Sequence, residues 1–180
     1  MKPFWVFITN ATKQLNVQIF LALLVLVLCF LGSRIRTATL LALAAWPLAD
    51  IFSNSLKRLI PFERPCVALP DVHLRIHKLT TFGTASSHAA NMAAITCVFW
   101  YFLGWRGGLA WLFVALLSGL SRIYVGVHFP SQVLLGYLCG SLCGFIVART
   151  WATYASRRSQ RQAAQIESDS RPVSPQQAAP

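Results

Sequence analysis

The chain has 180 residues, of which 56% are hydrophobic and only 12% are charged, and its formal net charge is +11. Soluble domains average roughly 25% charged residues, and one small domain cannot bury so much apolar surface, so the composition excludes an ordinary soluble fold. The Lys and Arg residues lie between apolar segments rather than in one basic stripe, which argues against nucleic-acid binding and favours contact with anionic lipid and phosphate.

The chain begins with an aromatic, amphipathic segment, residues 3–13, which is too short to span a bilayer and predicts an interfacial helix. A polar stretch, residues 57–84, interrupts the apolar segments that follow. Residues 155–180 are rich in Gln, Ser, Ala and Pro and predict a disordered cytoplasmic tail after a membrane domain over residues 1–154. Together these features predict an all-α integral membrane bundle of about five spans, at residues 17–32, 37–56, 86–105, 108–125 and 130–151.

Positive charges in the short loops predict the orientation. Arg34 and Arg36 join the first two spans, Arg106 joins the third and fourth, and Arg149 follows the fifth. Five spans place all of these on one side, which the positive-inside rule makes cytoplasmic. The sequence therefore predicts a multi-pass protein of the cell (inner) membrane. The positive-inside rule does not explain the cations on the extracytoplasmic face, which therefore indicate a functional role. These cations are Lys57, Arg58, Arg64, Arg75, Lys78 and Arg122.

The first polar segment on that face follows the second span. Lys57 and Arg64 are seven positions apart, about two helical turns, and would share a face if the helix continued past Pro61. Taken alone, interfacial cations that reach lipid headgroups explain the segment equally well. Asp50 lies within the second span, seven positions before Lys57, and is predicted to support the basic cluster because acids inside membranes are usually functional or paired.

The second polar segment opens the third span. Ser86 or Ser87 is a suitable N-cap, and a helix N-terminus offers free N–H groups to a phosphate oxygen. A plain helix cap is the simpler alternative. Asn91 lies one turn after His88 and is predicted to orient its imidazole.

The third polar segment joins the last two spans. Arg122 lies near the end of the fourth span, Gly126 allows a turn, and Pro130 suits the first position of the fifth helix. His128 and Gln132 are four positions apart and can form a hydrogen bond if that helix begins by residue 129. A single histidine at a span boundary is usually structural, but three segments that bring cations and histidines to one face indicate a phosphate site.

These segments resemble the type 2 phosphatidic acid phosphatase family, whose site design is shared with vanadium-dependent haloperoxidases. The family pattern is K-x6-R-P, then P-S-G-H, then S-R-x5-H-x3-D. The chain departs from it at Ala85, at Ser87 in place of the glycine, and at Gln132 in place of the acid. Order and spacing agree over roughly residues 50–150, with matches at Lys57, Arg64, Pro65, Ser86, His88, Ser121, Arg122 and His128.

The resemblance implies a membrane phosphatase for lipid phosphates or diphosphates such as undecaprenyl diphosphate, phosphatidylglycerophosphate, phosphatidic acid or the lipid A phosphates. His128 would attack phosphorus to form a phosphohistidine, and His88 would protonate the leaving oxygen. Neither a metal ion nor another cofactor is expected, because the few candidate carboxylates are scattered along the chain. The phosphate oxygens would be held by Lys57, Arg64, Ser86, Ser87 and Arg122.

Gln132 affects the expected rate of phosphate hydrolysis. In the family the acid at this place accepts a hydrogen bond from the nucleophilic histidine and stabilises its positive charge, so Gln132 implies a slower enzyme that Gln132→Asp would accelerate. Two alternatives stay open: a lipid-to-lipid phosphotransferase with the same fold, and a catalytically silent membrane protein that binds anionic lipid. A transporter is disfavoured because the polar groups collect at one face and leave no polar path through the spans.

Overall fold

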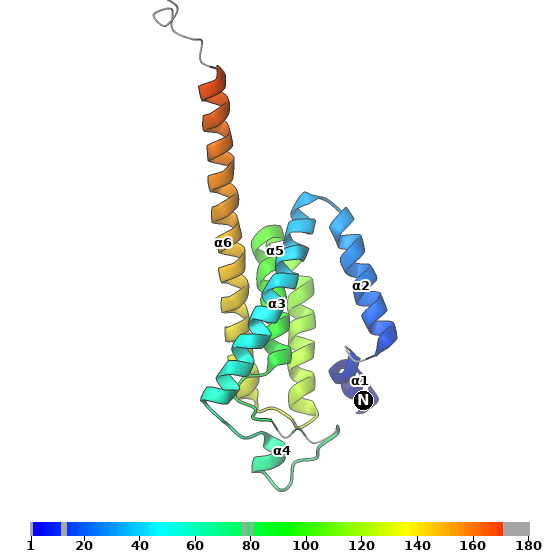
Figure 1. Ribbon diagram of the computed structural model, residues 1–180. Coiled ribbons are helices and arrows are strands. Elements are labelled where there is room, and N and C mark those ends of the chain that lie inside the picture. Colours follow the sequence, from blue (N-terminus) through cyan, green and yellow to red (C-terminus); the bar gives the residue numbers. More distant parts are fainter. Residues whose placement is uncertain (1, 12–13, 77–78, 80, 171–180) are drawn as a thin grey trace, which may run out of the picture. The chain divides into compact units, whose positions relative to one another are not determined.

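The computed structural model describes residues 2–11, 14–76, 79 and 81–170. Every regular element of these residues is a helix, as the composition predicts (Figure 1). The elements in chain order are α1 (Lys2–Asn10), α2 (Leu15–Phe30), α3 (Ser33–Leu59), α4 (Pro65–Ala68), α5 (Ser87–Tyr124) and α6 (Pro130–Ser170).

The chain divides into two units, Met1–Ala148 and Arg149–Pro180, and the boundary lies within α6. The structure differs from the sequence prediction after residue 154, because α6 continues to Ser170 where a disordered tail was expected. Residues 151–170 contain no Gly or Pro and several good helix formers (Ala, Arg and Gln), so nothing local ends the helix. Residues 171–180 of the predicted tail lie outside the described residues.

A break at Gly104 divides α5 into two halves. Gly104 has φ 68° and ψ −164°, a backbone conformation that side chains other than glycine rarely adopt. The two halves fold back on each other and run side by side (Figure 1), with the rings of Phe99 and Trp111 5.1 Å apart. The third and fourth predicted spans are therefore the two halves of α5.

Small residues line the contact between the helices of the bundle. A row of alanines on one face of α3 packs against Ala90 and Ala94 of α5, together with Cys143 of α6. At Gly140 of α6 a side chain would collide with the carbonyl of Ala90, so glycine is required for the close approach of the two helices. Such packing is typical of membrane helices. The row on α3 consists of Ala38, Ala42, Ala45 and Ala49.

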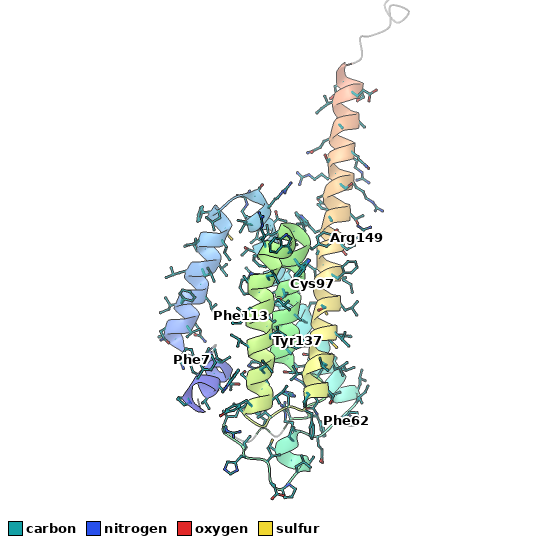
Figure 2. All side chains as sticks on the ribbon, turned by 180° about the vertical axis from the view of Figure 1, so that it is seen from behind. Phe7, Phe62, Cys97, Phe113, Tyr137 and Arg149 are labelled. Atoms are coloured by element: carbon teal, nitrogen blue, oxygen red, sulfur yellow. The ribbon has the colours of Figure 1, made fainter. Side chains whose placement is uncertain are left out.

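Long apolar helices with exposed apolar side chains make this chain a membrane protein. α3, α5 and α6 are each long and apolar enough to cross a bilayer, and the bent pair of α1 and α2 meets the same criterion as one unit. Phe113 on α5 is 64% exposed and projects from the bundle (Figure 2), where lipid would cover it. Counting α2 and the two halves of α5 with α3 and α6 gives the five expected segments; the number of crossings stays a prediction.

Several elements meet at one end of the bundle, where α4, the last turn of α3 and the first turns of α5 and α6 lie together (Figure 1). The backbone N–H of Ser86 donates to the carbonyl of Gln132 at 2.9 Å, which joins the starts of α5 and α6. α1 packs at the same end, with the ring of Trp5 5.6 Å from that of Tyr124. This end therefore collects all three polar segments of the sequence.

Candidate active site

A cavity of about 650 Å³ opens at this end of the bundle. Residues from α1, from the segment between α4 and α5, and from the ends of α3 and α5 line it. Six of the side chains that the sequence analysis predicts for the phosphate site line this cavity: Lys57, Arg64, Ser87, His88, Arg122 and His128. The three polar segments thus form one site, although more than 60 residues separate the first from the last.

Lys57 and Arg64 reach the cavity by different routes, because the helix does not continue past Pro61, which is the condition under which they would share a helical face. α3 ends at Leu59, and Ile60 has φ −129° and ψ 86°. Proline disfavours the helical conformation in the residue before it, so Pro61 ends the helix at this point. The chain then turns, and Arg64 returns to the cavity just before α4.

Lys57 is held by a chain of hydrogen bonds along α3. Its Nζ donates to Ser87 Oγ at 2.6 Å and to Asn54 Oδ1 at 2.9 Å, and Asn54 Nδ2 donates to Asp50 Oδ2 at 3.0 Å. Asp50 therefore reaches Lys57 through Asn54, which sequence reasoning did not select. The spacing of positions 50, 54 and 57 along one helix face is the signal that would have found it.

Arg64 is 4% exposed and fixed by backbone carbonyls. Its Nε donates to Thr81 O at 2.6 Å, and its two Nη atoms donate to Phe82 O and Val127 O, both at 3.1 Å. Nη1 also lies 2.8 Å from Nε2 of His128. Burial lowers the pKa of Arg64 from its usual value, but a guanidinium stays protonated in proteins. A positive charge therefore faces the imidazole.

The hydrogen bonds of His128 set its tautomer. Its Nδ1 lies 3.1 Å from the carbonyl oxygen of Gly83 and 3.1 Å from Oε1 of Gln132. A carbonyl oxygen can only accept, so Nδ1 carries the proton. Nε2 is then unprotonated, its lone pair accepts from Arg64 Nη1, and both residues line the cavity. The hydrogen bond that the sequence predicts between His128 and Gln132 is present.

Gln132 is held in one orientation. Its Nε2 donates to the carbonyl of Glu63 at 2.8 Å, while its Oε1 accepts from His128 Nδ1 and from the backbone N–H of Phe129 at 3.2 Å. If the amide were flipped, its NH₂ group would face the N–H groups of His128 and Phe129, and its oxygen would face the carbonyl oxygen of Glu63. The amide therefore presents its oxygen to the imidazole and favours the tautomer that leaves Nε2 unprotonated.

The electrostatic surroundings of His128 favour a neutral imidazole. Burial is the largest effect and, with the charges of Arg64, Arg122 and Lys57, it lowers the pKa of His128 to about 3, against a smaller opposite effect of the hydrogen bond to Gln132. The unfolded chain takes up a proton at this residue below about pH 6.5, and the folded chain does not. The contribution of His128 to folding stability should therefore decrease as the pH falls from about 6.5 towards 3.

We expect the imidazole of His128 to stay neutral from about pH 5 to about pH 8. The ring signals of His128 should not shift over this range in an NMR titration of the detergent-solubilised protein with ¹⁵N-labelled histidine. A spectrum of the His128→Ala variant identifies the signals that belong to His128. A His128 signal that titrates near the usual value of about 6.5 would contradict the assigned environment.

The two serines at the start of α5 differ in position. Ser86 is fully buried, caps the helix by accepting from the N–H of Ala89 at 3.5 Å, and is not among the residues that line the cavity. Ser87 lines the cavity and accepts from Lys57. The serine that replaces the glycine of the family pattern therefore presents its hydroxyl to the site. A phosphate contact from the Ser86 side chain stays a prediction.

His88 lies on the cavity wall near Ser87. The Oδ1 of Asn91, one turn further along α5, is buried and has no hydrogen-bond partner within the part of the chain that the structure describes. The predicted role of Asn91 in orienting His88 stays a prediction.

Arg122 is held by the N-terminal helix. It is 5% exposed, and its Nη1 donates to Thr9 Oγ1 at 3.3 Å, while Thr9 and Ser121 hydroxyls lie 3.1 Å apart. Its Nε is buried without a hydrogen-bond partner among the described residues. Sequence reasoning missed Thr9, because no motif or spacing links α1 to the end of α5.

The arrangement combines a neutral imidazole with three cations and a second histidine. Among the described residues, no group of three His, Cys, Asp or Glu side chains is placed to hold a metal ion. A metal-free chemistry stays a prediction that a chelator experiment can test. The cations on the cavity wall are well suited to hold the oxygens of a phosphoryl group, whose transfer depends mainly on positioning and charge stabilisation.

Comparison with protein families agrees with this arrangement. A family model described as the PAP2 superfamily matches residues 37–156. That range includes every cavity residue that the sequence analysis selects, and it excludes α1, which carries Thr9.

Individual relatives are similar over part of their length. The chain is 31% identical over 112 residues to bacitracin transport permease protein BcrC from Bacillus licheniformis, covering 62% of this chain and 55% of that protein. It is 30% identical over 129 residues to undecaprenyl-diphosphatase BcrC from Bacillus subtilis strain 168, covering 71% and 66%. The matches thus span between about half and two thirds of these two relatives. The crystal structure of LpxE from Aquifex aeolicus matches with a TM-score of 0.69 and 26% identity, over 82% of this chain and 85% of that one.

Proposed function

This chain belongs to the PAP2 superfamily, and we propose that it hydrolyses the phosphate or diphosphate group of a membrane lipid through a phosphohistidine intermediate. One observation carries the proposal. A buried imidazole, protonated on Nδ1, presents the lone pair of Nε2 to a cavity lined by Lys57, Arg64 and Arg122. A neutral nucleophile surrounded by cations is suited to attack an anionic phosphoryl group.

The first step forms a bond between His128 Nε2 and phosphorus. Arg64, which donates to Nε2 in the structure, would turn this donor to a phosphate oxygen when the substrate binds. As the N–P bond forms, positive charge develops on the ring, and the Nδ1 proton is shared with the carbonyl of Gly83 and the amide of Gln132. Two neutral acceptors stabilise this charge less than a carboxylate would, which predicts a modest rate.

His88 would protonate the oxygen of the leaving group as the P–O bond breaks. Water then attacks the phosphohistidine, the N–P bond breaks, and inorganic phosphate leaves. Through both steps the cationic side chains hold the equatorial oxygens, and the bond from Lys57 keeps the Ser87 hydroxyl at the cavity wall.

Release of inorganic phosphate from a panel of lipids tests the proposal. The purified protein would be assayed in detergent with EDTA against undecaprenyl diphosphate, phosphatidylglycerophosphate, phosphatidic acid and lipid A. We expect release from at least one of them that EDTA does not abolish. Transfer of phosphate to an added acceptor lipid would indicate a phosphotransferase. Binding without release from any lipid, or a strict requirement for Mg²⁺, would contradict the proposal.

The proposal also places the site on the extracytoplasmic face of a cell membrane. Arg34 and Arg36 at the start of α3 and Arg106 after the break in α5 lie away from the cavity, which supports a cytoplasmic position for that end under the positive-inside rule.

Cys66 reports this topology because it lies in α4, beside Arg64, and is partly exposed. A variant that retains Cys66 as its only cysteine should react with a membrane-impermeant maleimide in intact spheroplasts. The same variant with Cys66→Ser supplies the blank. Labelling that appears only after lysis would place the site on the cytoplasmic side.

A further inference from the structure

A fourth cation, Arg75, lies on the wall of the cavity and belongs to none of the three family motifs. Its Nη1 donates to the carbonyl of Tyr124 at 2.6 Å, and its backbone N–H donates to the carbonyl of Val125 at 3.3 Å. The guanidinium lies over the ring of Tyr124 at 4.5 Å from the centroid. Arg75 is therefore fixed to the end of α5, with its guanidinium at the cavity.

The position of Arg75 is supported from α1 as well. The ring of Trp5 lies 5.6 Å from that of Tyr124, so Tyr124 contacts both Trp5 and the guanidinium. Such a stack holds the guanidinium plane while its N–H groups stay available. The Nε of Arg75 is buried and has no hydrogen-bond partner among residues 2–11, 14–76, 79 and 81–170. A buried donor without an acceptor costs free energy, so the described residues alone do not satisfy this guanidinium.

Arg75 is separate from the cations around the nucleophile. Arg64 Nη1 lies 2.8 Å from His128 Nε2. Arg75 makes no hydrogen bond to His128 among the described residues. It is held instead by the backbone at the end of α5. The cavity, at about 650 Å³, falls within the range of roughly 300–1,000 Å³ of pockets for whole small molecules and has room for more than one phosphate group.

We propose that Arg75 forms a second phosphate subsite, which binds the phosphate that stays on the lipid while the terminal phosphate is transferred to His128. This inference rests on the proposed function and specifies its substrate class as a lipid diphosphate. In the transfer, the bond between His128 Nε2 and the terminal phosphorus forms and the bridging P–O bond breaks. The lipid leaves as a monophosphate, and water then releases inorganic phosphate from the histidine.

Kinetics on two substrates of the same chain length test the subsite. Farnesyl diphosphate and farnesyl monophosphate would be compared as values of kcat/KM for the wild type and for Arg75→Gln. A charge-assisted contact to the retained phosphate predicts that Arg75→Gln lowers the ratio of diphosphate to monophosphate activity by about 10-fold or more. Arg75→Lys keeps the charge and should keep most of the ratio.

Arg58→Gln is the matched control, because Arg58 lies on the last turn of α3, is exposed, and does not line the cavity. It removes the same charge at the same end of the bundle and should leave the ratio unchanged. Repeating the assays in anionic and zwitterionic micelles separates the retained phosphate from the headgroup of a neighbouring lipid. A loss that is equal for both substrates and depends on anionic micelles would overturn the subsite.

Other results of these kinetic assays would also test the phosphate subsite. If Arg75→Gln lowers both activities equally in all micelles, Arg75 has only a structural role and the inference is wrong. If the wild type cleaves only the monophosphate, the subsite is wrong while the proposed function stands. If no inorganic phosphate is released from either farnesyl substrate or from any lipid of the panel, both the proposed function and the subsite are wrong.

Discussion

Replacing His128 with alanine is expected to abolish phosphate release from the lipid substrate. The imidazole supplies the atom that bonds to phosphorus, with its proton held on Nδ1 and the lone pair of Nε2 beside the Arg64 guanidinium. Removal of a catalytic nucleophile costs on the order of 10⁵-fold or more in turnover. Steady-state release of inorganic phosphate measures the effect.

The matched control for this variant is His73→Ala. His73 is exposed, lies in the segment before α5 and is not among the residues that line the cavity. Its replacement should leave turnover close to that of the wild type. Size-exclusion chromatography in detergent would show that both variants fold. A folded His128→Ala protein that keeps more than a few per cent of the wild-type rate would show that another group attacks phosphorus.

Replacement of Gln132 is expected to have the second largest effect. The turnover rate should fall from the wild type to Gln132→Asp and fall further to Gln132→Ala. Gln132→Ala removes the side-chain acceptor of the Nδ1 proton and the donor to the Glu63 carbonyl. In serine proteases the corresponding loss of the correct partner costs about 10⁴-fold in turnover. The carbonyl of Gly83 still accepts from Nδ1 here, so we expect a smaller loss of about 10²-fold.

Gln132→Asp is expected to be slower than the wild type, which revises the expectation from sequence. A carboxylate would stabilise the charged imidazole better than an amide. It cannot donate to the Glu63 carbonyl, however, and aspartate is one methylene shorter than the side chain that spans the two contacts. A rate for Gln132→Asp above that of the wild type would show that charge stabilisation outweighs the lost donor. Rates for Gln132→Asp and Gln132→Ala that both equal the wild-type rate would show that residue 132 is not the partner of His128.

The order of polar residues along the chain predicted six of the side chains that line the cavity, although it also selected Ser86, which does not line it, and did not select Arg75. Lys57, Arg64, His88, Arg122 and His128 lie at the ends of apolar segments, and helices that cross together bring such ends to one face. The hydrogen bond between His128 and Gln132 followed from their spacing at a helix start. Local rules were sufficient in these cases because each contact is either within a turn or between neighbouring helix ends.

Contacts that depend on the path of the loops between helices could not be predicted from the sequence. Pro61 ends α3, so Arg64 approaches the cavity from a turn rather than from the helix face that its spacing suggested. Thr9 bonds to Arg122 across 113 positions, and the stack of Arg75 on Tyr124 depends on the path of the segment after α4. No periodicity or motif encodes such pairings, because they arise from the packing of whole elements.

Isolation of phosphate bound to His128 tests the central claim most directly. The wild type would be mixed with a ³²P-labelled lipid substrate, quenched in alkali and digested, and the labelled peptide identified by mass spectrometry. We predict label on the peptide that contains His128, stable to alkali and lost in acid as expected of a phosphohistidine, and absent from His128→Ala. Turnover with label on another residue would contradict the account.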